Sequence, residues 1–306
     1  MVAISTALNA RHRGSAREVF EELKALGYEQ FEVNVHFSEE MVEETERMVR
    51  AGEIEIVSVH NYCPVPPGIE RTRSGGDLFH FSAEEAEVRG QALKWTLRSI
   101  ETAARLGARF LVGHWGIVPV EDGKEVQHAA LERLRRGEPG VPEMVREAVE
   151  RRQAMARPYV ERALDTFSQL LPTAREHGVR LGVECRNYFH EIPSLEEVGE
   201  FLALDPAVIG YWHDIGHAEI LEFLGVVPER SFAARWADRA IAVHVHDVKQ
   251  GADHRPMGEG DIDFRAELSP FPASAPWVIE VHSGDAMTMR RMGEELRRIW
   301  SEIHNA

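Results

Sequence analysis

The sequence predicts an α/β protein with the fold of a (β/α)8 TIM barrel, in which eight parallel strands alternate with helices. Three observations carry this prediction. Short β-branched or apolar segments recur eight times, helical segments separate them, and six successive strands end in a histidine or a carboxylate. The 306 residues, 43% of them hydrophobic, are enough for one barrel domain that spans residues 1–306.

The strands and helices follow from the apolar pattern and from the residues that punctuate it. The expected strands are residues 2–8, 31–35, 54–60, 109–114, 179–184, 208–214, 241–246 and 277–281. The expected helices are residues 15–26, 38–50, 82–106, 143–177 and 285–300. The pairs Ser15–Glu18 and Ser82–Glu85 predict capped starts for the first and third helices.

Residues 119–142 are rich in charge, glycine and proline, and we expect them to form a long loop after the fourth strand. An open, doubly wound sheet is the alternative fold for the same alternation of strands and helices. No glycine-rich phosphate-binding turn follows the first strand, which counts against the dinucleotide-binding form of that fold.

Composition narrows the classes of binding partner and the cellular compartment that we expect for this protein. The formal net charge is −16, and an acidic protein repels phosphate backbones, so nucleic acid is not the expected partner. Cys63 and Cys185 are too few for a disulfide framework and suit a reducing compartment. The N-terminus lacks the pattern of a secretory signal, and no apolar run reaches the length of a membrane span, so we expect a cytoplasmic protein with no membrane partner. The oligomeric state is left open, a homo-oligomer included.

The residues at the strand ends are those that bind metals and transfer protons. Strands three to eight end with His60, His114, Glu184, Asp214, the pair His244 and His246, and Glu280. In a barrel these ends meet on one face, where enzymes of this fold have their active sites. The residues two positions earlier should line the barrel interior, and all are small or apolar: Ser58, Val112, Gly182, Trp212, Ala242 and Val278. Several ionisable groups at one height favour a functional site, because unpaired buried charges are costly.

The spacing of Asp214 and His217 adds to the evidence for a functional site. His217 follows Asp214 by about one helical turn, so both side chains can face one ion. Glutamate, aspartate and neutral histidine are ligands that suit Mn, Mg, Co or Zn. The sequence therefore predicts a divalent metal site on the rim.

Three segments carry a resemblance to a known family. They are GVRLGVECRN at residues 178–187, YWHDIGHA at residues 211–218 and AVHVHDVKQGADHRPMGEGDIDF at residues 242–264. The last contains H-x-x-D, a further histidine and then G-x-G-x-[IL]-D. With these segments the chain resembles the xylose-isomerase-like TIM-barrel superfamily over nearly its whole length. That superfamily contains sugar and sugar-phosphate isomerases and epimerases, and also barrel-type apurinic-site endonucleases.

The resemblance implies a metal-dependent isomerase or epimerase that acts on a small carbohydrate through an enediolate. It implies one divalent ion (Mn, Mg, Co or Zn) held by Glu184, Asp214, His244 and Glu280, with Glu184 and Glu280 as the catalytic proton carriers. His217 and His254 would contact substrate or a second metal, and His60, His114 and His246 are further candidates for such contacts. Arg186 and Lys249 stand just beyond strand ends and could hold a phosphate or a polyol, with a solvated loop charge as the alternative. His244 is preferred to His246 as the ligand because the family pattern has an aspartate, here Asp247, three residues later.

Two other functions stay open. A metal-cluster phosphodiesterase similar to the apurinic-site endonucleases would use most of the same residues. However, Ala252 stands where that group has a metal-bridging aspartate, and Asp253 is one place away. The sequence also has no evident basic, aromatic-rich surface for DNA. The third function is a barrel that binds a sugar or a metal without turnover.

Overall fold

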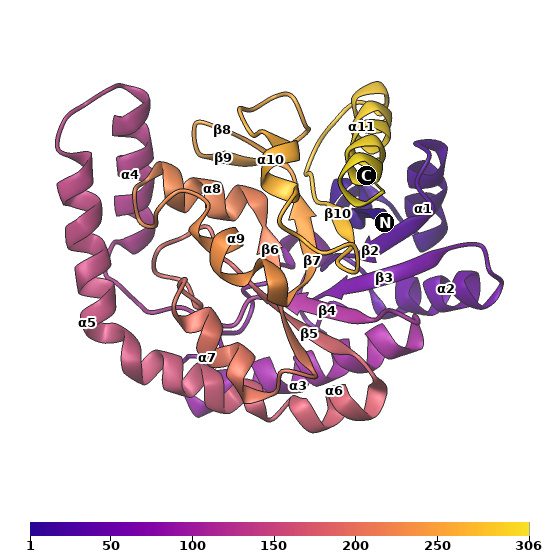
Figure 1. Ribbon diagram of the computed structural model, residues 1–306. Helices are drawn as coiled ribbons and strands as arrows, with labels where there is room; N and C mark the ends of the chain where they lie inside the picture. The colour runs from indigo at the N-terminus through magenta and orange to yellow at the C-terminus, as the bar shows by residue number, and fades with distance from the viewer. Residues whose placement is uncertain (306) are drawn as a thin grey trace.

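The computed structural model describes residues 1–305 and forms a closed barrel of eight parallel strands (Figure 1). The barrel strands are β1 (Val2–Ser5), β2 (Gln30–Val33), β3 (Glu55–His60), β4 (Phe110–Gly113), β5 (Arg180–Glu184), β6 (Ile209–Asp214), β7 (Ala240–Val245) and β10 (Trp277–Ile279). β1 pairs with β10 as well as with β2, with Ala3 opposite Val278, and this pairing closes the barrel. The predicted fold class is confirmed.

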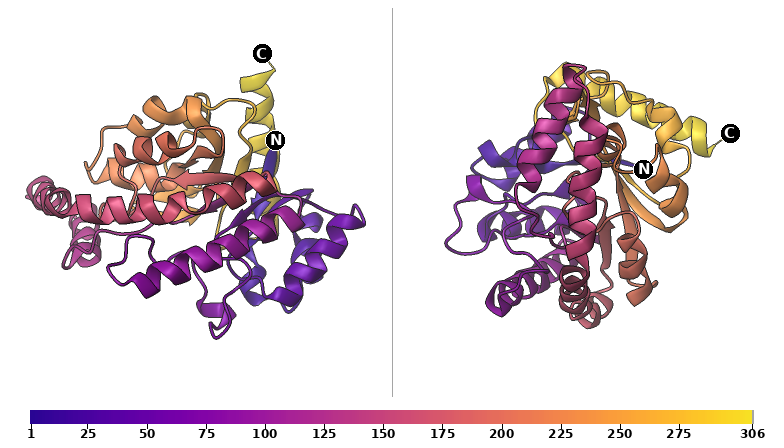
Figure 2. Two further views of the ribbon diagram at one scale, coloured as in Figure 1. Left: turned by 90° about the horizontal axis from the view of Figure 1, so that it is seen from below. Right: turned by 90° about the vertical axis from the view of Figure 1, so that its left-hand side faces the viewer.

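Helices surround the barrel in all three views (Figures 1 and 2). They are α1 (Ala16–Ala25), α2 (Glu39–Arg50), α3 (Ala86–Arg105), α4 (Gly123–Arg135), α5 (Val141–Ser168), α6 (Leu171–His177), α7 (Glu197–Leu204), α8 (Ile215–Phe223), α9 (Ser231–Trp236), α10 (Phe264–Leu268) and α11 (Ala286–His304). Short 3-10 turns lie at Thr6–Leu8, Ala10–His12, Arg71–Arg73 and Ala237–Arg239. Within residues 1–305, no helix combines the length and the apolar character needed to cross a membrane.

The two predicted capping pairs behave differently. The Ser15 hydroxyl accepts the backbone N–H of Glu18 at 3.2 Å, and α1 begins at the next residue, as predicted. The prediction for Ser82 and Glu85 is wrong, because α3 begins only at Ala86 and Ser82 does not cap it. Instead, the Ser82 hydroxyl donates to the carbonyl of Ile117 at 2.7 Å and accepts its N–H at 2.9 Å. The Ser82 hydroxyl, which the local pattern assigned to a helix cap, therefore forms a tertiary contact between two loops.

The expected loop at residues 119–142 is also wrong, since most of it is the helix α4. Val126, Ala130 and Leu134 recur every four residues and give the helix an apolar face under its charged exposed side. That face contributes to a small separate core, which consists of Ala130, Leu131, Val141, Val145, Ile220, Leu224 and Val248. α4 and the start of α5 therefore extend to one side of the barrel (Figures 1 and 2).

Two further elements differ from the expectation. The helical region predicted at residues 143–177 is two helices, α5 and α6, with a proline at the start of α6. After β7, where only a loop was expected, the chain forms a hairpin of β8 (Asp247–Lys249) and β9 (Ala252–Arg255). The hairpin stands on the rim beside α8 (Figure 1).

The interior of the barrel is a layer of closely packed side chains, and at one position this packing leaves no room for a larger residue. Val112, Trp212, Ala242 and Val278 lie in a buried cluster separate from the core under the helices, as their strand positions predicted. Gly182 leaves room for the indole of Trp212, because a Cβ at this glycine would lie 2.7 Å from Trp212 Cε3. The layer under the site therefore depends on a residue without a side chain.

We expect Gly182→Ala to lower the free energy of unfolding by about 1–3 kcal/mol, because the added methyl forces Trp212 to move in a closed interior. Chemical denaturation monitored by tryptophan fluorescence measures this. Gly90→Ala is the control, since Gly90 is exposed inside α3 with nothing within 4 Å of an added Cβ. It should raise stability by up to about 1 kcal/mol. Equal stability of the two variants would contradict the packing argument.

Candidate metal and active site

Four of the strand-end residues, His60, His114, Glu184 and Glu280, line a cavity of about 330 Å³ at the carboxyl-terminal face of the barrel. Its polar lining includes His60, His114, Glu184, Arg186, His217, His254 and Glu280. Glu184 and Asp214 are the last residues of β5 and β6, and Glu280 directly follows β10. Parallel strands in register bring these positions to one height.

Glu184, Asp214, His244 and Glu280 lie together as a group. His244 Nδ1 lies 2.9 Å from Glu184 Oε1, 3.1 Å from Glu280 Oε2 and 3.6 Å from Asp214 Oδ2. One ligand atom from each of the four residues lies within 4.8 Å of the others. All four side chains are buried. The barrel thus brings together the four residues that the sequence selected as a metal site.

The chemistry of these donors fits a divalent cation. Nδ1 of His244 can carry one proton, yet three carboxylates face it, so one proton cannot satisfy them all. Asp214 Oδ2 is buried and has no hydrogen-bond partner within residues 1–305. A buried carboxylate oxygen without a partner is costly, and a cation bound by three oxygens and one nitrogen would remove that cost. Mn, Mg, Co and Zn all accept such a ligand set.

The surroundings keep the acids ionised, which is the form that binds metals. Burial raises the pKa of Glu184, but hydrogen bonds from His114 and His244 and the charge of Arg186 outweigh it and hold that pKa well below its usual value. Burial likewise raises the pKa of Asp214, and the nearby His217 and His246 lower it further than burial raises it. The group is therefore a centre of negative charge.

Sequence reasoning missed Glu32 on β2, which supports the group from below. Both of its carboxylate oxygens lie 3.2 Å from His244 Nε2, and the Ser58 hydroxyl donates to Oε2 at 2.8 Å. Burial lowers the pKa of His244, but Glu280 and Glu32 raise it well above its usual value. A carboxylate on Nε2 sets the ring so that Nδ1 faces the other three acids. The only local signal was a charged residue inside the apolar run from Phe31 to Val33.

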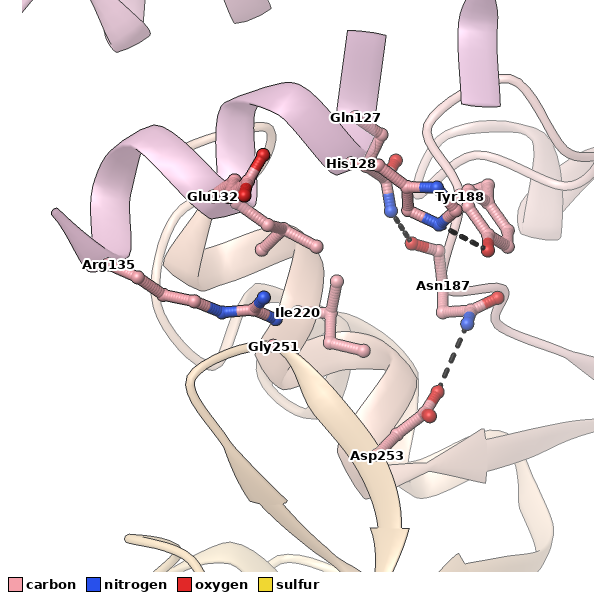
Figure 3. Close-up of a pocket in the computed structure, with 10 residues that line it drawn as sticks. Gln127, His128, Glu132, Arg135, Asn187, Tyr188, Ile220, Gly251 and Asp253 are labelled. Carbon is pink, nitrogen blue, oxygen red and sulfur yellow. Dashed lines mark hydrogen bonds between the residues drawn. The ribbon is translucent and has the colours of Figure 1, made fainter. Parts of the chain in front are cut away.

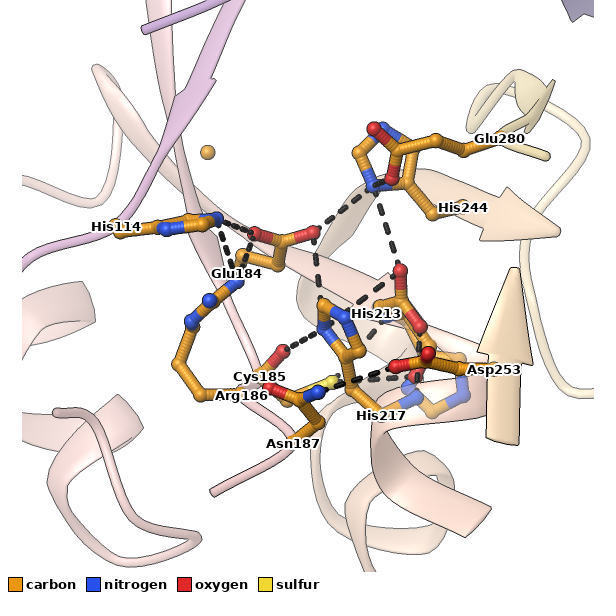
Figure 4. Close-up of polar contacts among 12 residues, drawn as sticks. His114, Glu184, Cys185, Arg186, Asn187, His213, His217, His244, Asp253 and Glu280 are labelled. Atoms are coloured by element: carbon orange, nitrogen blue, oxygen red, sulfur yellow. Dashed lines mark hydrogen bonds and ion pairs between the residues drawn. The ribbon is translucent and has the colours of Figure 1, made fainter. Parts of the chain in front are cut away.

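Arg186 lies beside the group and not in solvent. Its Nη1 lies 2.6 Å from His114 Nε2 and 3.0 Å from Glu184 Oε2 (Figure 4). Its Nη2 lies 3.2 Å from Glu191 Oε1. Asp77 Oδ1 lies 2.7 Å from the other ring nitrogen of His114. Asp77 and Glu191 were not among the sequence candidates, because both stand in loops far from any strand end. A fixed guanidinium therefore supplies positive charge next to Glu184.

Four more histidines surround the group in different ways. His246 Nε2 lies 2.9 Å from Asp214 Oδ1, and its Nδ1 accepts the backbone N–H of His254 at 2.9 Å. Both nitrogens of His246 are thus engaged, and its ring holds Asp214 in place.

His217 Nδ1 lies 3.0 Å from the carbonyl of Cys185, and His254 Nε2 lies 3.6 Å from Glu280 Oε2. His217 and His254 line the cavity, as does His60, whose ring stacks on that of His244 at 6.2 Å between centroids.

Lys249 differs from the other candidates, because it is exposed on β8 and does not line the cavity. The hairpin directs its side chain into solvent, away from the cavity. Asp247, at the start of the same strand, accepts the N–H groups of Gly258 and Gly260 at 2.8 and 2.9 Å. The family pattern of an aspartate followed by G-x-G thus describes a carboxylate that holds a loop in shape. Asp253 accepts from the Asn187 amide at 3.1 Å and lies 3.3 Å from His254.

Comparisons with known proteins agree with the fold. The sequence model of the xylose isomerase-like TIM barrel matches residues 20–299. A D-tagatose 3-epimerase-like protein has 18% identity and a TM-score of 0.67, with 99% of this chain and 98% of that chain covered. An L-ribulose 3-epimerase has 14% identity and a TM-score of 0.68, with 98% and 94% covered. A 3-keto-D-glucoside 4-epimerase from E. coli has 16% identity and a TM-score of 0.66, with 97% of both chains covered. No curated protein sequence gives a match.

We expect Glu32→Gln to weaken the binding of Mn²⁺ or Co²⁺ about 10- to 100-fold, because an amide holds the His244 ring less firmly than a carboxylate does. Isothermal titration of the metal-free protein measures the affinity. Glu29→Gln is the matched control, since Glu29 is exposed just before β2. Metal affinity unchanged in Glu32→Gln would show that Glu32 does not support the site.

Proposed function

Because this chain belongs to the xylose isomerase-like TIM barrel family, we propose that it is a divalent-metal-dependent isomerase or epimerase of sugars or sugar phosphates. Three of its structural neighbours bear the names of sugar epimerases or of a protein like one. Their likeness to this chain is one of fold, so the proposal depends on the residues of the site itself.

The observation that carries the proposal is the pair Glu184 and Glu280. The two glutamates come from β5 and from the end of β10, and both line the same cavity. They reach His244 Nδ1 at 2.9 and 3.1 Å, so their carboxylates approach one point from two strands. Two acids on different sides of a bound carbon are what removal and return of a proton require.

The proposed reaction uses these two acids in turn. One glutamate removes the proton from the carbon beside the carbonyl of a ketose, and the electron pair left behind forms an enediolate. The other glutamate, which enters the reaction with a proton taken from solvent, donates it to the opposite face of that carbon, which inverts it, or to the neighbouring carbon, which moves the carbonyl. The first glutamate then releases its proton to solvent. A divalent ion on Glu184, Asp214, His244 and Glu280 would supply the positive charge that favours negative oxygens on the substrate.

Other residues of the cavity would orient the sugar and the acids. The Asn34 amide donates to Glu280 Oε1 at 3.3 Å, and Arg186 donates to Glu184 Oε2 at 3.0 Å. Each glutamate is thus held by a neutral or cationic donor on one oxygen. His217 and His254 line the cavity, where they can contact hydroxyl or phosphate oxygens of the substrate.

A metal-cluster phosphodiesterase is the second candidate, and one observation favours it. Two further groups have ligand atoms within 4.8 Å of one another: His60, His114 and Glu184 form one, and Asp214, His217, His246 and His254 form the other. Three features argue against it. Arg186 Nη1 lies 2.6 Å from His114 Nε2 and 3.0 Å from Glu184 Oε2, both nitrogens of His246 are engaged, and Ala252 supplies no carboxylate. The isomerase or epimerase is therefore the better supported function.

We expect Glu184→Gln and Glu280→Gln each to lower turnover by about 10²- to 10⁴-fold while metal binding falls less, since glutamine keeps an oxygen but carries no proton. The assay is exchange of the proton beside the carbonyl with solvent deuterium, with Mn²⁺ and a panel of ketoses. Glu176→Gln, at an exposed position of α6, is the control. Near-normal exchange in either active-site variant would remove that glutamate from the reaction.

Metal content separates the two candidate functions. We expect one tightly bound divalent ion per chain and no cleavage of duplex DNA at abasic sites, because Arg186 already supplies a cation next to His114 and Glu184. Elemental analysis after dialysis measures the ion count, and an abasic oligonucleotide tests the cleavage. Three ions per chain with abasic-site cleavage that Glu280→Gln abolishes would favour the phosphodiesterase.

A further inference from the structure

A second cavity of about 360 Å³ lies beside the catalytic one (Figure 3). Its walls come from α4, from the segment after β5, from α8 and from the β8–β9 hairpin. We call it the α4 cavity. The polar residues on its wall include His128, Glu132, Arg135, Asn187, Tyr188 and Asp253.

The α4 cavity and the catalytic cavity share a wall. Asn187 and Tyr188 line both of them. Lys124 of α4 lines the catalytic cavity, and its Nζ lies 5.0 Å from the centroid of the Tyr188 ring. Asp253 lines the α4 cavity and lies 3.3 Å from His254, which lines the catalytic cavity. Asn187 and Tyr188 thus form a wall common to both cavities, so the two cavities are immediate neighbours on the same face of the barrel.

This shared wall is held firmly in place. The Gln127 amide donates to the carbonyl of Asn187 at 2.6 Å, and its oxygen accepts the N–H of Phe189 at 3.0 Å. His128 Nε2 lies 3.0 Å from the Tyr188 hydroxyl (Figure 3).

Gly251, at a φ of +75°, lets the hairpin approach α4, since a Cβ there would lie 2.5 Å from Leu131. A rigid wall is what a binding site needs.

The chemistry of the wall matches a neutral sugar unit. Arg135 and the Asn187 amide offer donors, and Glu132 and Asp253 offer acceptors, so one cationic side chain faces two anionic ones. That balance disfavours a phosphate or another anion. Leu131, Ile220 and the ring of Tyr188 add apolar surface, on which the C–H face of a sugar ring can pack. Hydroxyl groups both donate and accept, and so they can use the two kinds of polar partner. A volume of about 360 Å³ lies within the range of small-molecule sites.

The position of α4 in the chain points to the same role. It is inserted between β4 and α5, and it packs mainly against α5 and the small separate core rather than in the barrel. Loops that follow barrel strands determine what such an enzyme binds. The helix encloses the α4 cavity and also delivers Lys124 to the catalytic one.

We propose that the α4 cavity binds a second sugar unit of the substrate, so that the enzyme acts on a ketose that carries a glycosyl group. This inference rests on the proposed reaction in the catalytic cavity. The ketose unit lies beside Glu184 and Glu280, and the attached sugar lies between α4 and the hairpin.

The test compares D-fructose with three glucosyl-fructose disaccharides, isomaltulose, maltulose and turanose, whose linkages direct the glucose unit differently. Affinity is measured by isothermal titration on the protein loaded with Mn²⁺, and proton exchange with solvent deuterium is measured on the same samples. At least one disaccharide should bind about tenfold more tightly than fructose. In His128→Ala and in Arg135→Ala the ratio of disaccharide to fructose affinity should fall about tenfold, as expected for loss of a hydrogen bond to a charged or polar group.

Glu125→Ala is the control, because Glu125 is exposed on the same helix and lines neither cavity. Its affinity ratio should equal that of the wild-type protein. Circular dichroism checks that every variant is folded. If no disaccharide binds more tightly than fructose, or if both variants keep the wild-type ratio, the α4 cavity is not a sugar subsite. Should fructose still exchange its proton in that case, the proposed function stands. If no sugar exchanges a proton and yet the variants lose disaccharide binding, the reaction is wrong and the subsite is supported.

Discussion

The burial of four carboxylates around one imidazole is the constraint on which the rest of this structure depends. Glu32, Glu184, Asp214 and Glu280 all approach His244, and each of them is removed from water. Taking even one such ion out of water costs several kcal/mol after the protein relaxes. The barrel can carry this arrangement only because positive charge is concentrated in the same place. His244 and Arg186 provide part of it, and the unpartnered oxygen of Asp214 marks where more is needed.

The positive groups are not interchangeable. Arg186 is always charged and is held by Glu184 and Glu191, so it keeps one side of the group permanently cationic. His244 can carry a proton or offer a lone pair, and Glu32 orients its ring for either state. His246 instead orients Asp214, because its two nitrogens are engaged by Asp214 and by the backbone of His254. The arrangement leaves one place for a cation, among three acids and Nδ1 of His244.

The rim around this centre is built from strand ends of the barrel and from elements added outside the barrel. Residues at the strand ends lie on the rigid barrel, which positions groups precisely enough for proton transfer. The α4 helix and the β8–β9 hairpin are additions outside the barrel, and each has its own local support. Asp247 holds the loop after the hairpin through backbone N–H groups, and Leu131 of α4 packs closely against Gly251. Chemistry and the shape of the binding region are thus supported by different parts of the chain.

Sequence alone determined the barrel and, to within two residues, the ends of its third to eighth strands, whereas the first strand ends at Ser5 and not at residue 8. Glu184, Asp214, His244 and Glu280 were among the candidates because a strand pattern and its end are local features, and parallel strands of a barrel end on one face. The resemblance to the family then singled out these four as the metal ligands. The role of Glu32 could not be found in this way, since it depends on a contact with a residue 212 positions away. Arg186 had no local sign that it would turn inward, nor Lys249 that it would stay in solvent. The helix at residues 123–135 and the loss of the Ser82 cap likewise follow from packing partners distant in sequence. Local pattern specifies which face a residue takes within its own element, whereas closure of the barrel decides which charges meet, and that step belongs to the tertiary structure.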